Sequence, residues 1–224
     1  MNYDWNFGRL RPYADAFGRG TLVTIELTLL VVVIGTFLGF LIGIFAQRRW
    51  MRAPLWFLTN LVMSLPPLVL LLFAYYLLTE QVIGTTVQAF WVCVVALSVN
   101  LAAFTGDLVR AALGSVPNEA LDAGRALGMS ERQVVRHIVI PHVVREIIPA
   151  MTMLYIAMLK LTSLASIINV REVTYAAQTV VATVSRSLEA WAVVAGIYIV
   201  LVSPLTLLAR RLERVSGRRH YEVR

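Results

Sequence analysis

The sequence predicts an all-α, polytopic membrane protein with about five transmembrane helices. Three observations support this prediction: an apolar composition, long apolar runs and a one-sided distribution of arginine. Hydrophobic residues make up 58% of the chain, charged residues make up only 15%, and the mean hydropathy is +0.73. A soluble domain carries about a quarter charged residues, because a domain of this size still needs a largely polar surface. A lipid bilayer removes that requirement.

Five apolar runs are long enough to cross a bilayer, for which a helix needs about 20 residues. They cover residues 21–46, 54–78, 85–109, 143–168 and 190–209. The second run contains Pro66 and Pro67, which we expect to kink or unwind it. The mixed segment 169–189 is expected to form a short helix that lies outside the membrane or dips into it. No linker separates a second domain, so residues 1–224 are expected to form a single transmembrane domain.

Arginine is distributed unevenly between the two faces that five crossings define. Fourteen arginines lie in the turn after the first run, in or beside the central loop and in the C-terminal tail, whereas five lie on the opposite face. The first set is Arg48, Arg49, Arg52, Arg110, Arg125, Arg132, Arg136, Arg145, Arg210, Arg211, Arg214, Arg218, Arg219 and Arg224. Because cytoplasmic loops carry an excess of positive charge, we predict an N-terminus outside and a C-terminus inside.

This topology also explains the net charge of +7, so no nucleic-acid partner is expected. The basic C-terminal tail is interpreted as a stop-transfer anchor. The alternative is that it binds anionic lipid.

The central loop, residues 115–141, has the residues of two short helices joined by a bend. Good helix formers precede Gly128, which can end the first helix because glycine adopts a left-handed backbone without penalty. Ser130 can cap a second helix, and Gln133 completes a capping-box pattern with it. Pro141 is expected to break or kink that second helix.

Small residues form a stripe along the first helix of the loop. Ala120, Gly124 and Gly128 recur at a spacing of four, which places them on one helix face. Gly124 costs about 1 kcal/mol relative to alanine within a helix. The stripe is therefore expected to let another protein approach the backbone closely. The alternative is that Gly124 is a tolerated weak point in an ordinary loop helix.

The spacing in this loop is similar to that of the EAA loop of bacterial ATP-binding cassette (ABC) importer permeases. The pattern of that family is Glu-Ala-Ala, three residues, glycine, nine residues, and then isoleucine, any residue, leucine and proline. This sequence has, in the same order, Asp122-Ala123-Gly124, Gly128 and Ile138-Val139-Ile140-Pro141. The spacing matches throughout, whereas Asp122, Gly124 and Ile140 differ in residue type.

The resemblance implies a function and a set of partners. Residues 20–24, 125–130 and 160–166 further resemble the branch of the family that takes up polar amino acids. The resemblance implies that the chain is a permease subunit in the bacterial inner membrane. It further implies import of a polar amino acid or related small solute, which a periplasmic solute-binding protein delivers. The chain has no G-x-x-x-x-G-K-[ST] phosphate loop. ATP and magnesium are therefore expected in a separate ATPase dimer, and this chain is expected to be non-catalytic, with no cofactor or metal of its own.

The resemblance also implies that one set of loop residues couples the permease to its ATPase. The set is Asp122, Ala123, Gly124, Gly128, Ile138 and Pro141. The aspartate would make an acidic contact, the next two residues would pack closely, and Gly128 would form the bend. The isoleucine and proline would set the second helix back against the membrane.

Polar side chains at membrane depth are costly and are candidates for the solute path. The candidates are Asn100, Lys160, Thr162 and Ser163. In the alternative interpretation, Lys160 pairs with a neighbouring helix or extends to the membrane surface, and Asn100 bonds between helices. Asp107 and Arg110 stand three residues apart and are expected to form a structural pair on one helix face.

Three positions lack the polar group that the family often has there. Ser64 stands where arginine is common, Leu71 where glutamine is common, and Leu161 where aspartate is common. We therefore expect a second, non-identical permease to carry more of the solute contacts. Two alternatives remain for the function: import of an opine or compatible solute by the same mechanism, and a membrane channel outside the ABC family.

Overall fold

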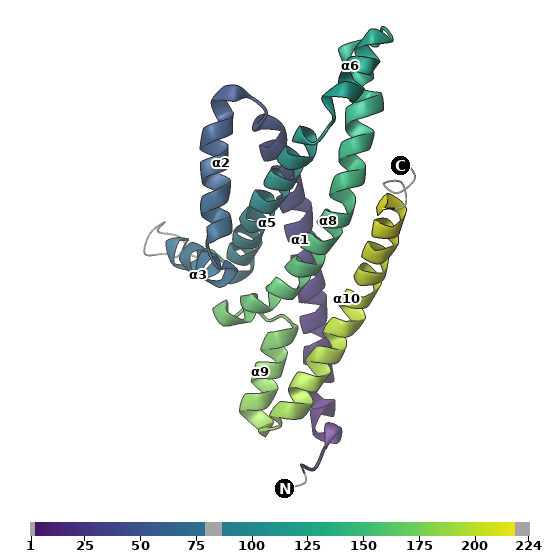
Figure 1. Cartoon of the computed structure of the whole chain (residues 1–224). Helices are drawn as coiled ribbons and strands as arrows, with labels where there is room; N and C mark the ends of the chain where they lie inside the picture. Colours follow the sequence, from purple (N-terminus) through teal and green to yellow (C-terminus); the bar gives the residue numbers. More distant parts are fainter. Residues whose placement is uncertain (1–2, 79–86, 218–224) are drawn as a thin grey trace.

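The computed structural model describes residues 3–78 and 87–217, with side chains described as far as residue 212, and all regular structure in these ranges is helical (Figure 1). The predicted all-α class is therefore confirmed. The elements in chain order are η1 (Phe7–Tyr13), α1 (Ala14–Phe45), α2 (Arg49–Ser64), α3 (Pro67–Leu77), α5 (Ala89–Gly114), α6 (Asn118–Ala126), α7 (Glu131–Val134), η2 (Val135–Val139), α8 (Ile140–Leu161), η3 (Thr162–Ile168), α9 (Val173–Val184) and α10 (Ser187–Gly217).

The number of membrane spans agrees with the prediction. Four helices of the described ranges are long and apolar enough to cross a membrane, and the bent pair α2–α3 makes up to five if it counts as one span. The helices extend beyond the apolar runs. Helix α1 begins at Ala14, before the run at 21–46, and its polar first turns contain an ion pair of 2.9 Å between Arg19 and Asp15, one turn apart. Residues 85–86, where the third run was expected to start, lie outside the described residues.

The second span is broken where the sequence predicts a break. Helices α2 and α3 meet at an angle of 104°. Leu65 and Pro66 between them are extended, with ψ of 132° and 135°. Each of these two residues precedes a proline, and the ring of a following proline disfavours the helical region. Proline geometry therefore accounts for the bend.

Helices α1 and α5 form the most extensive helix pair of the described structure, and glycines of α1 allow their close approach. A Cβ built on Gly39 would lie 2.4 Å from Cβ of Thr105, and one built on Gly35 would lie 2.8 Å from Cβ of Leu101. Gly43 meets Val109 in the same way, at 2.6 Å. This is the small-residue packing that brings helix backbones together in membranes, where van der Waals contact drives helix association. The sequence interpretation did not identify this stripe.

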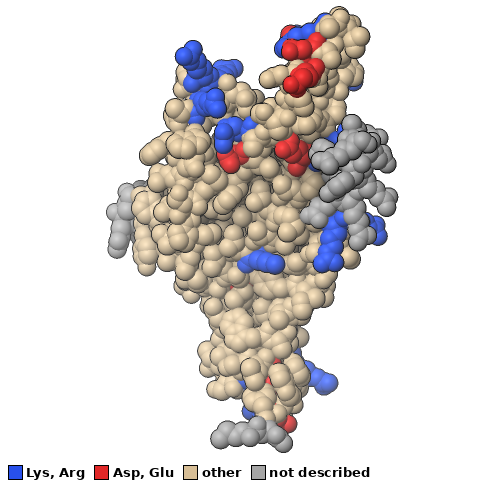
Figure 2. All heavy atoms as spheres, viewed as in Figure 1, with Lys and Arg blue, Asp and Glu red and all other residues tan. Residues whose placement is uncertain are grey.

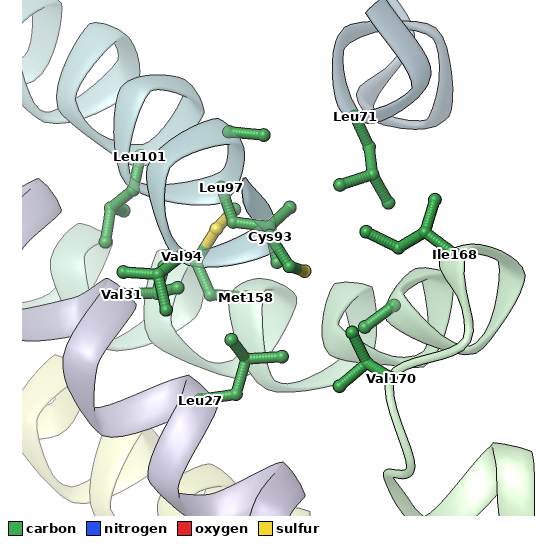
Figure 3. Packing of buried hydrophobic residues seen from close by; sticks show 12 residues of the cluster. Leu27, Val31, Leu71, Cys93, Val94, Leu97, Leu101, Met158, Ile168 and Val170 are labelled. Atoms are coloured by element: carbon green, nitrogen blue, oxygen red, sulfur yellow. The ribbon is translucent and has the colours of Figure 1, made fainter. Parts of the chain in front are cut away.

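The largest apolar core lies where α1, α3, α5, α8 and η3 meet (Figure 3). Leu27 of α1, Leu71 of α3, Leu97 of α5 and Met158 of α8 are all buried in this cluster, and Leu71 points toward Ile168 of η3. Cys93 lies in the same cluster as a fully buried free thiol, so it packs as a small apolar side chain. Because four separate helices contribute, the core holds the spans together in one bundle.

The segment 169–189, whose location the sequence left open, contains helix α9, and α9 packs against α1 and α10. Glu172 is fully buried and caps α9, because its carboxylate accepts bonds from the backbone N–H of Thr174 at 2.9 Å and of Tyr175 at 2.8 Å. The start of α9 also lies close to α1, because a Cβ built on Gly20 of α1 would lie 2.9 Å from Cα of Val173. The helix is therefore an integral part of the bundle.

The two ends of the bundle differ in the helix ends and in the positive charge that lie there (Figures 1 and 2). Helix α1 starts at the end marked N, whereas the α1–α2 turn, α6 and the end of α10 lie toward the opposite end (Figure 1). On the face shown in Figure 2, most lysine and arginine atoms lie toward that opposite end, above a broad band with few charges. An odd number of crossings places the two ends of the chain in this way. Which end is cytoplasmic stays a prediction from the arginine distribution.

Candidate coupling loop

The loop between α5 and α8 projects beyond the bundle, with α6 at its tip (Figure 1). Helix α6 follows Pro117, and Glu119 in its first turn and Arg125 in its last have the charges that favour the two ends of a helix dipole. A bend then leads into α7. The predicted pair of helical segments is therefore present, as a compact protrusion rather than an open connection.

The bend is a glycine-dependent helix end. Gly128 has φ of +77°, a left-handed conformation that costs other residues energy. Its N–H donates to the carbonyl of Arg125 at 2.9 Å, and the N–H of Met129 donates to the carbonyl of Gly124 at 3.1 Å. This pair of bonds is the Schellman motif, which satisfies carbonyls that a helix end otherwise leaves without donors. The bend that the sequence predicts at Gly128 is therefore present.

The second helical segment starts with the predicted cap. The N–H of Gln133 donates to Oγ of Ser130 at 3.4 Å, and the N–H of Ser130 donates to Oε1 of Gln133 at 2.7 Å. These two bonds form a capping box. The side chains of Ser130 and Gln133 therefore fix the start of the second helical segment.

Pro141 does not break the helix, although a break was one of the two outcomes expected there. The helix continues from α7 through η2, a π-helical turn, into α8, so the second segment is the first part of a helix that spans Glu131–Ile168. In the π-turn the N–H of Ile140 donates to the carbonyl of Val135, five residues earlier. A π-turn widens the helix locally, and this relieves the clash that Pro141 would otherwise make with the preceding turn. The second segment of the loop and the span α8 therefore belong to one continuous helix.

Gly124, the middle residue of the small-residue stripe on α6, has a packing partner within the chain. Gly124 is buried, and a Cβ built on it would lie 2.7 Å from Cδ1 of Ile138, 3.4 Å from Sδ of Met129 and 3.5 Å from Cγ2 of Val134. The close approach is therefore made by the second helical segment of the same chain, not by another protein. The absence of a side chain at Gly124 lets the two segments pack side by side.

Arg125 joins the two segments on their outer side. Its Nε donates to Glu131 at 2.9 Å across the bend, and its Nη1 donates to Asp122 at 3.3 Å within α6. The hydrogen bond and the negative charge of Glu131 raise the pKa of the Arg125 guanidinium, so it keeps its charge. All three side chains are solvent-exposed, so the contribution to stability is small, and the bridge mainly selects one orientation of the tip. The three-residue spacing of Asp122 and Arg125 was visible in the sequence, whereas the bond to Glu131 depends on the bend.

Three of the residues at the tip remain open to contact from outside. Asp122 has 74% of its side chain exposed, and Ala123 is exposed beside it. Leu127 is 84% exposed, more than any other large apolar residue described. The sequence interpretation missed it, although an apolar residue directly before a helix-ending glycine is a signal that could have found it. The tip therefore presents one carboxylate and one large apolar side chain to its surroundings.

The base of the loop is tied to two spans. Oγ of Ser115, at the end of α5, lies 3.2 Å from Nε2 of His142 on α8 and also donates to Glu146 on that helix. Below these polar contacts, Val109 of α5 and Val143 of α8 belong to one buried apolar cluster. The base of the loop is therefore in contact with both α5 and α8.

The polar candidates within the spans do not form a single cluster. Lys160 lines a groove of about 510 Å³ between α8 and α10, which Tyr198 and Arg210 also line. Thr162 is buried and its hydroxyl donates to the carbonyl of Leu159 at 2.7 Å, while the hydroxyl of Ser163 donates to the carbonyl of Lys160 at 2.8 Å. The two hydroxyls are thus occupied by their own helix, and only the lysine faces the groove.

Asn100 and the Asp107–Arg110 pair have different environments on α5. Asn100 is 1% exposed, and neither polar atom of its amide has a partner within the described residues. A buried amide without a partner is costly. Asp107 and Arg110 form an ion pair on one helix face, as predicted.

Comparison with known proteins connects this geometry to one family. The family described as binding-protein-dependent transport system inner membrane components matches residues 35–219. The glutamine transport system permease protein GlnP of Escherichia coli strain K12 is 29% identical over 218 residues, which cover 96% of this chain and 98% of that protein. The octopine transport system permease protein OccM of Rhizobium radiobacter is 31% identical over 191 residues, with 81% and 78% covered. A chain of the crystal structure described as an amino acid ABC transporter with histidines has a TM-score of 0.85 and 28% identity, and 96% of this chain and 99% of that one are covered.

Proposed function

Because this chain belongs to the family of binding-protein-dependent transport system inner membrane components, and is a permease subunit of an ABC importer, we propose that it moves a polar amino acid or a related small solute across the bacterial inner membrane. The direction is from periplasm to cytoplasm. A separate ATPase dimer, which binds the ATP and magnesium, drives the transport, and a periplasmic solute-binding protein delivers the solute.

The rigid protrusion at the end of α5 and α8 is the observation that carries the proposal. Asp122, Ala123 and Leu127 form its exposed tip, and the Schellman motif at Gly128 and the packing of Gly124 on Ile138 hold its shape. A protrusion of this kind suits docking into a groove of an ATPase subunit, with Leu127 as the apolar anchor and Asp122 as the charged contact at its rim.

The continuous helix gives the docked tip a mechanical connection to the membrane. Closure of the ATPase dimer on ATP moves the tip, and α7 transmits the movement through the π-turn at Val135–Val139 into α8. Helix α5 moves with it through the contacts of Ser115 with His142 and Glu146. The spans then alternate between inward-facing and outward-facing states. Ile138 and Pro141 take part by keeping tip and span in register.

Two solute classes are supported by different relatives. GlnP is a glutamine transport system permease, which supports a polar amino acid, and OccM is an octopine transport system permease, which supports an opine. Both classes carry a carboxylate and a charged or polar group. The cations Lys160 and Arg210 in the groove between α8 and α10 are suited to a carboxylate, and the unpartnered amide of Asn100 is a second candidate contact.

Uptake of labelled solutes distinguishes these classes. We expect proteoliposomes that contain the complete transporter and its binding protein to take up a polar amino acid in an ATP-dependent manner, with opines taken up more slowly. ATP-dependent uptake of opines alone would move the assignment to the opine branch. Uptake that is equal with and without ATP would contradict an ATP-driven permease and favour a channel.

We further propose that the transporter contains a second, non-identical permease. At two positions where the family often has a polar solute contact, the side chains of this chain are engaged locally: Leu71 is fully buried in the core, and the hydroxyl of Ser64 donates to the carbonyl of Asn60 at 2.7 Å. The third, Leu161, is apolar. Two copies of this chain and no other permease in the purified complex, as determined by native mass spectrometry, would contradict the proposal.

The exposed leucine gives a direct test of docking. We expect Leu127→Asp to weaken binding of the ATPase by about 30-fold or more, because burial of a leucine contributes about 2 kcal/mol, a buried unpaired carboxylate adds a further cost, and 1.4 kcal/mol corresponds to about tenfold. The affinity is measured between the permease in nanodiscs and the purified ATPase. Leu127→Met is the matched control and should bind as the unchanged protein does. Equal affinity of Leu127→Asp and Leu127→Met would remove Leu127 from the interface.

A further inference from the structure

An apolar groove lies between α2 and the α1–α5 pair. Its volume is about 390 Å³. The side chains that line it include Leu38 and Phe45 of α1, Leu55 and Val62 of α2, and Val99 and Ala103 of α5. Thr59 is the one hydroxyl in the lining, and it donates within its own helix, to the carbonyl of Leu55 at 3.0 Å or that of Trp56 at 3.1 Å. The groove therefore offers no free polar group to a ligand along its length.

One end of this groove lies at a cluster of positive charge. Phe45 and Met51, on either side of the α1–α2 turn, line that end, and the guanidinium of Arg48 lies over the ring of Phe45, 5.4 Å from its centroid. Arg49 and Arg52 are exposed on the first turn of α2. In the part of the chain that the structure describes, none of these three arginines forms a salt bridge. Their charge is therefore available to an anion at the mouth of the groove.

We propose that this groove is a binding site for an anionic phospholipid, with one acyl chain between α1, α2 and α5 and the headgroup phosphate on Arg48 and Arg52. The two parts of the site match the two parts of such a lipid. The lining fits a hydrocarbon chain, whose burial is favourable for each methylene group, and arginine binds phosphate through paired hydrogen bonds. The exposed Trp50, at the start of α2, is the residue type that prefers the level of the headgroups.

A protein partner fits these observations less well. A helix with its side chains is about 10 Å wide, whereas α1, α2 and α5 already surround the groove on three sides and leave about 390 Å³ between them. A protein that covered these three exposed arginines would also have to place carboxylates opposite them. A phospholipid supplies the negative charge and the narrow apolar chain in one molecule. The site does not depend on which solute is transported.

Lipid retention in detergent tests the proposal. The transporter complex is incubated with phosphatidylglycerol or with phosphatidylcholine of identical acyl chains, and the lipid bound after delipidating washes is measured by native mass spectrometry. We expect preferential retention of phosphatidylglycerol. The double variant Arg48→Gln/Arg52→Gln should bind it about 25-fold more weakly, since each arginine near a headgroup contributes about fivefold, and should lose the preference over phosphatidylcholine.

Two further variants separate the headgroup contribution from the acyl-chain contribution. Val99 is 38% exposed and lines the groove, so Val99→Phe places a larger side chain in the groove and should lower the retention of both lipids. Arg9→Gln/Arg11→Gln removes the same net charge at the other end of the bundle and should retain lipid as the unchanged protein does.

Three results would overturn the proposal. The first is equal retention of the two lipids by the unchanged protein. The second is retention of phosphatidylglycerol by Arg48→Gln/Arg52→Gln at the level of Arg9→Gln/Arg11→Gln. The third comes from a photo-crosslinking amino acid placed at Val99 in membranes: adducts with a polypeptide in place of phospholipid would assign the groove to a protein partner. Transport assays are not needed for any of these results, so they are independent of the proposed solute.

Discussion

Gly128→Val is expected to abolish solute-stimulated ATP hydrolysis by the assembled transporter while the permease still accumulates in the membrane. The built Cβ at Gly128 meets no atom within 4 Å, so the substitution creates no clash. The effect comes from the backbone, which has φ of +77°. A left-handed conformation costs an ordinary residue about 1–2 kcal/mol and is a genuine outlier for a β-branched one. The helix end must then reorganise.

Reorganisation of this helix end affects the whole tip. Without the left-handed residue, the Schellman bonds of Gly128 and Met129 are lost, and Arg125 no longer reaches Glu131 across the bend. Leu127 and Asp122 then lose their fixed position relative to α7. Because about 1.4 kcal/mol corresponds to tenfold in population, we expect the dockable conformation to fall by about tenfold or more, and the stimulated rate to fall with it.

A matched variant isolates the backbone effect. Asparagine tolerates the left-handed region far better than valine, so Gly128→Asn should keep most of the stimulated ATPase activity. Both variants add a branched or polar side chain at the same open position, and they differ mainly in backbone preference. Activity is measured in nanodiscs with saturating loaded binding protein. If Gly128→Val and Gly128→Asn were stimulated equally, the left-handed bend would have no role in coupling.

Interactions between residues that are close in sequence could be predicted from the sequence alone. The helix end at Gly128, the capping box of Ser130 and Gln133, and the Asp107–Arg110 pair all join residues within five positions of one another. Such interactions depend on helix periodicity and turn chemistry, which are readable in the sequence. The predicted all-α class and the approximate positions of the spans were readable for a related reason, since apolar length alone decides whether a helix can cross a bilayer.

Features that depend on tertiary contacts were predicted wrongly or missed. The role of Gly124 depends on Ile138, which is brought against it only by the bend. A proline inside a helix usually breaks or kinks it, but at Pro141 the helix continues through a π-turn. The sequence contains no pattern that predicts this turn. Helix α10 begins at Ser187, and its fully buried Glu189 accepts a bond from the N–H of Asn6 at 3.0 Å and another from the hydroxyl of Tyr3. No local pattern relates residues so far apart in the chain.

Two glycines of α1 provide the second large expected effect, because the same substitution by alanine should lower the Tm at one of them and not at the other. Gly39→Ala places a Cβ 2.4 Å from Cβ of Thr105 and 3.0 Å from the carbonyl oxygen of Ala102. Carbon atoms pack at about 3.5–4.0 Å, so α1 and α5 must separate by about 1 Å along their most extensive contact. Overpacking of this kind costs about 1–3 kcal/mol, and the Tm in detergent should fall by about 2–12 °C.

Gly18→Ala adds the same methyl group to α1 where the built Cβ meets nothing within 4 Å. Alanine is favoured over glycine inside a helix by about 1 kcal/mol, so the Tm should stay the same or rise. The comparison cancels the helix propensity of the two residues and leaves only the packing of α1 on α5. A fall in Tm of equal size in both variants would show that glycine matters in α1 for a reason other than this packing. A fall in Tm for Gly39→Ala alone would establish that α5, which leads directly into the coupling loop, is positioned by the absence of side chains on its neighbour.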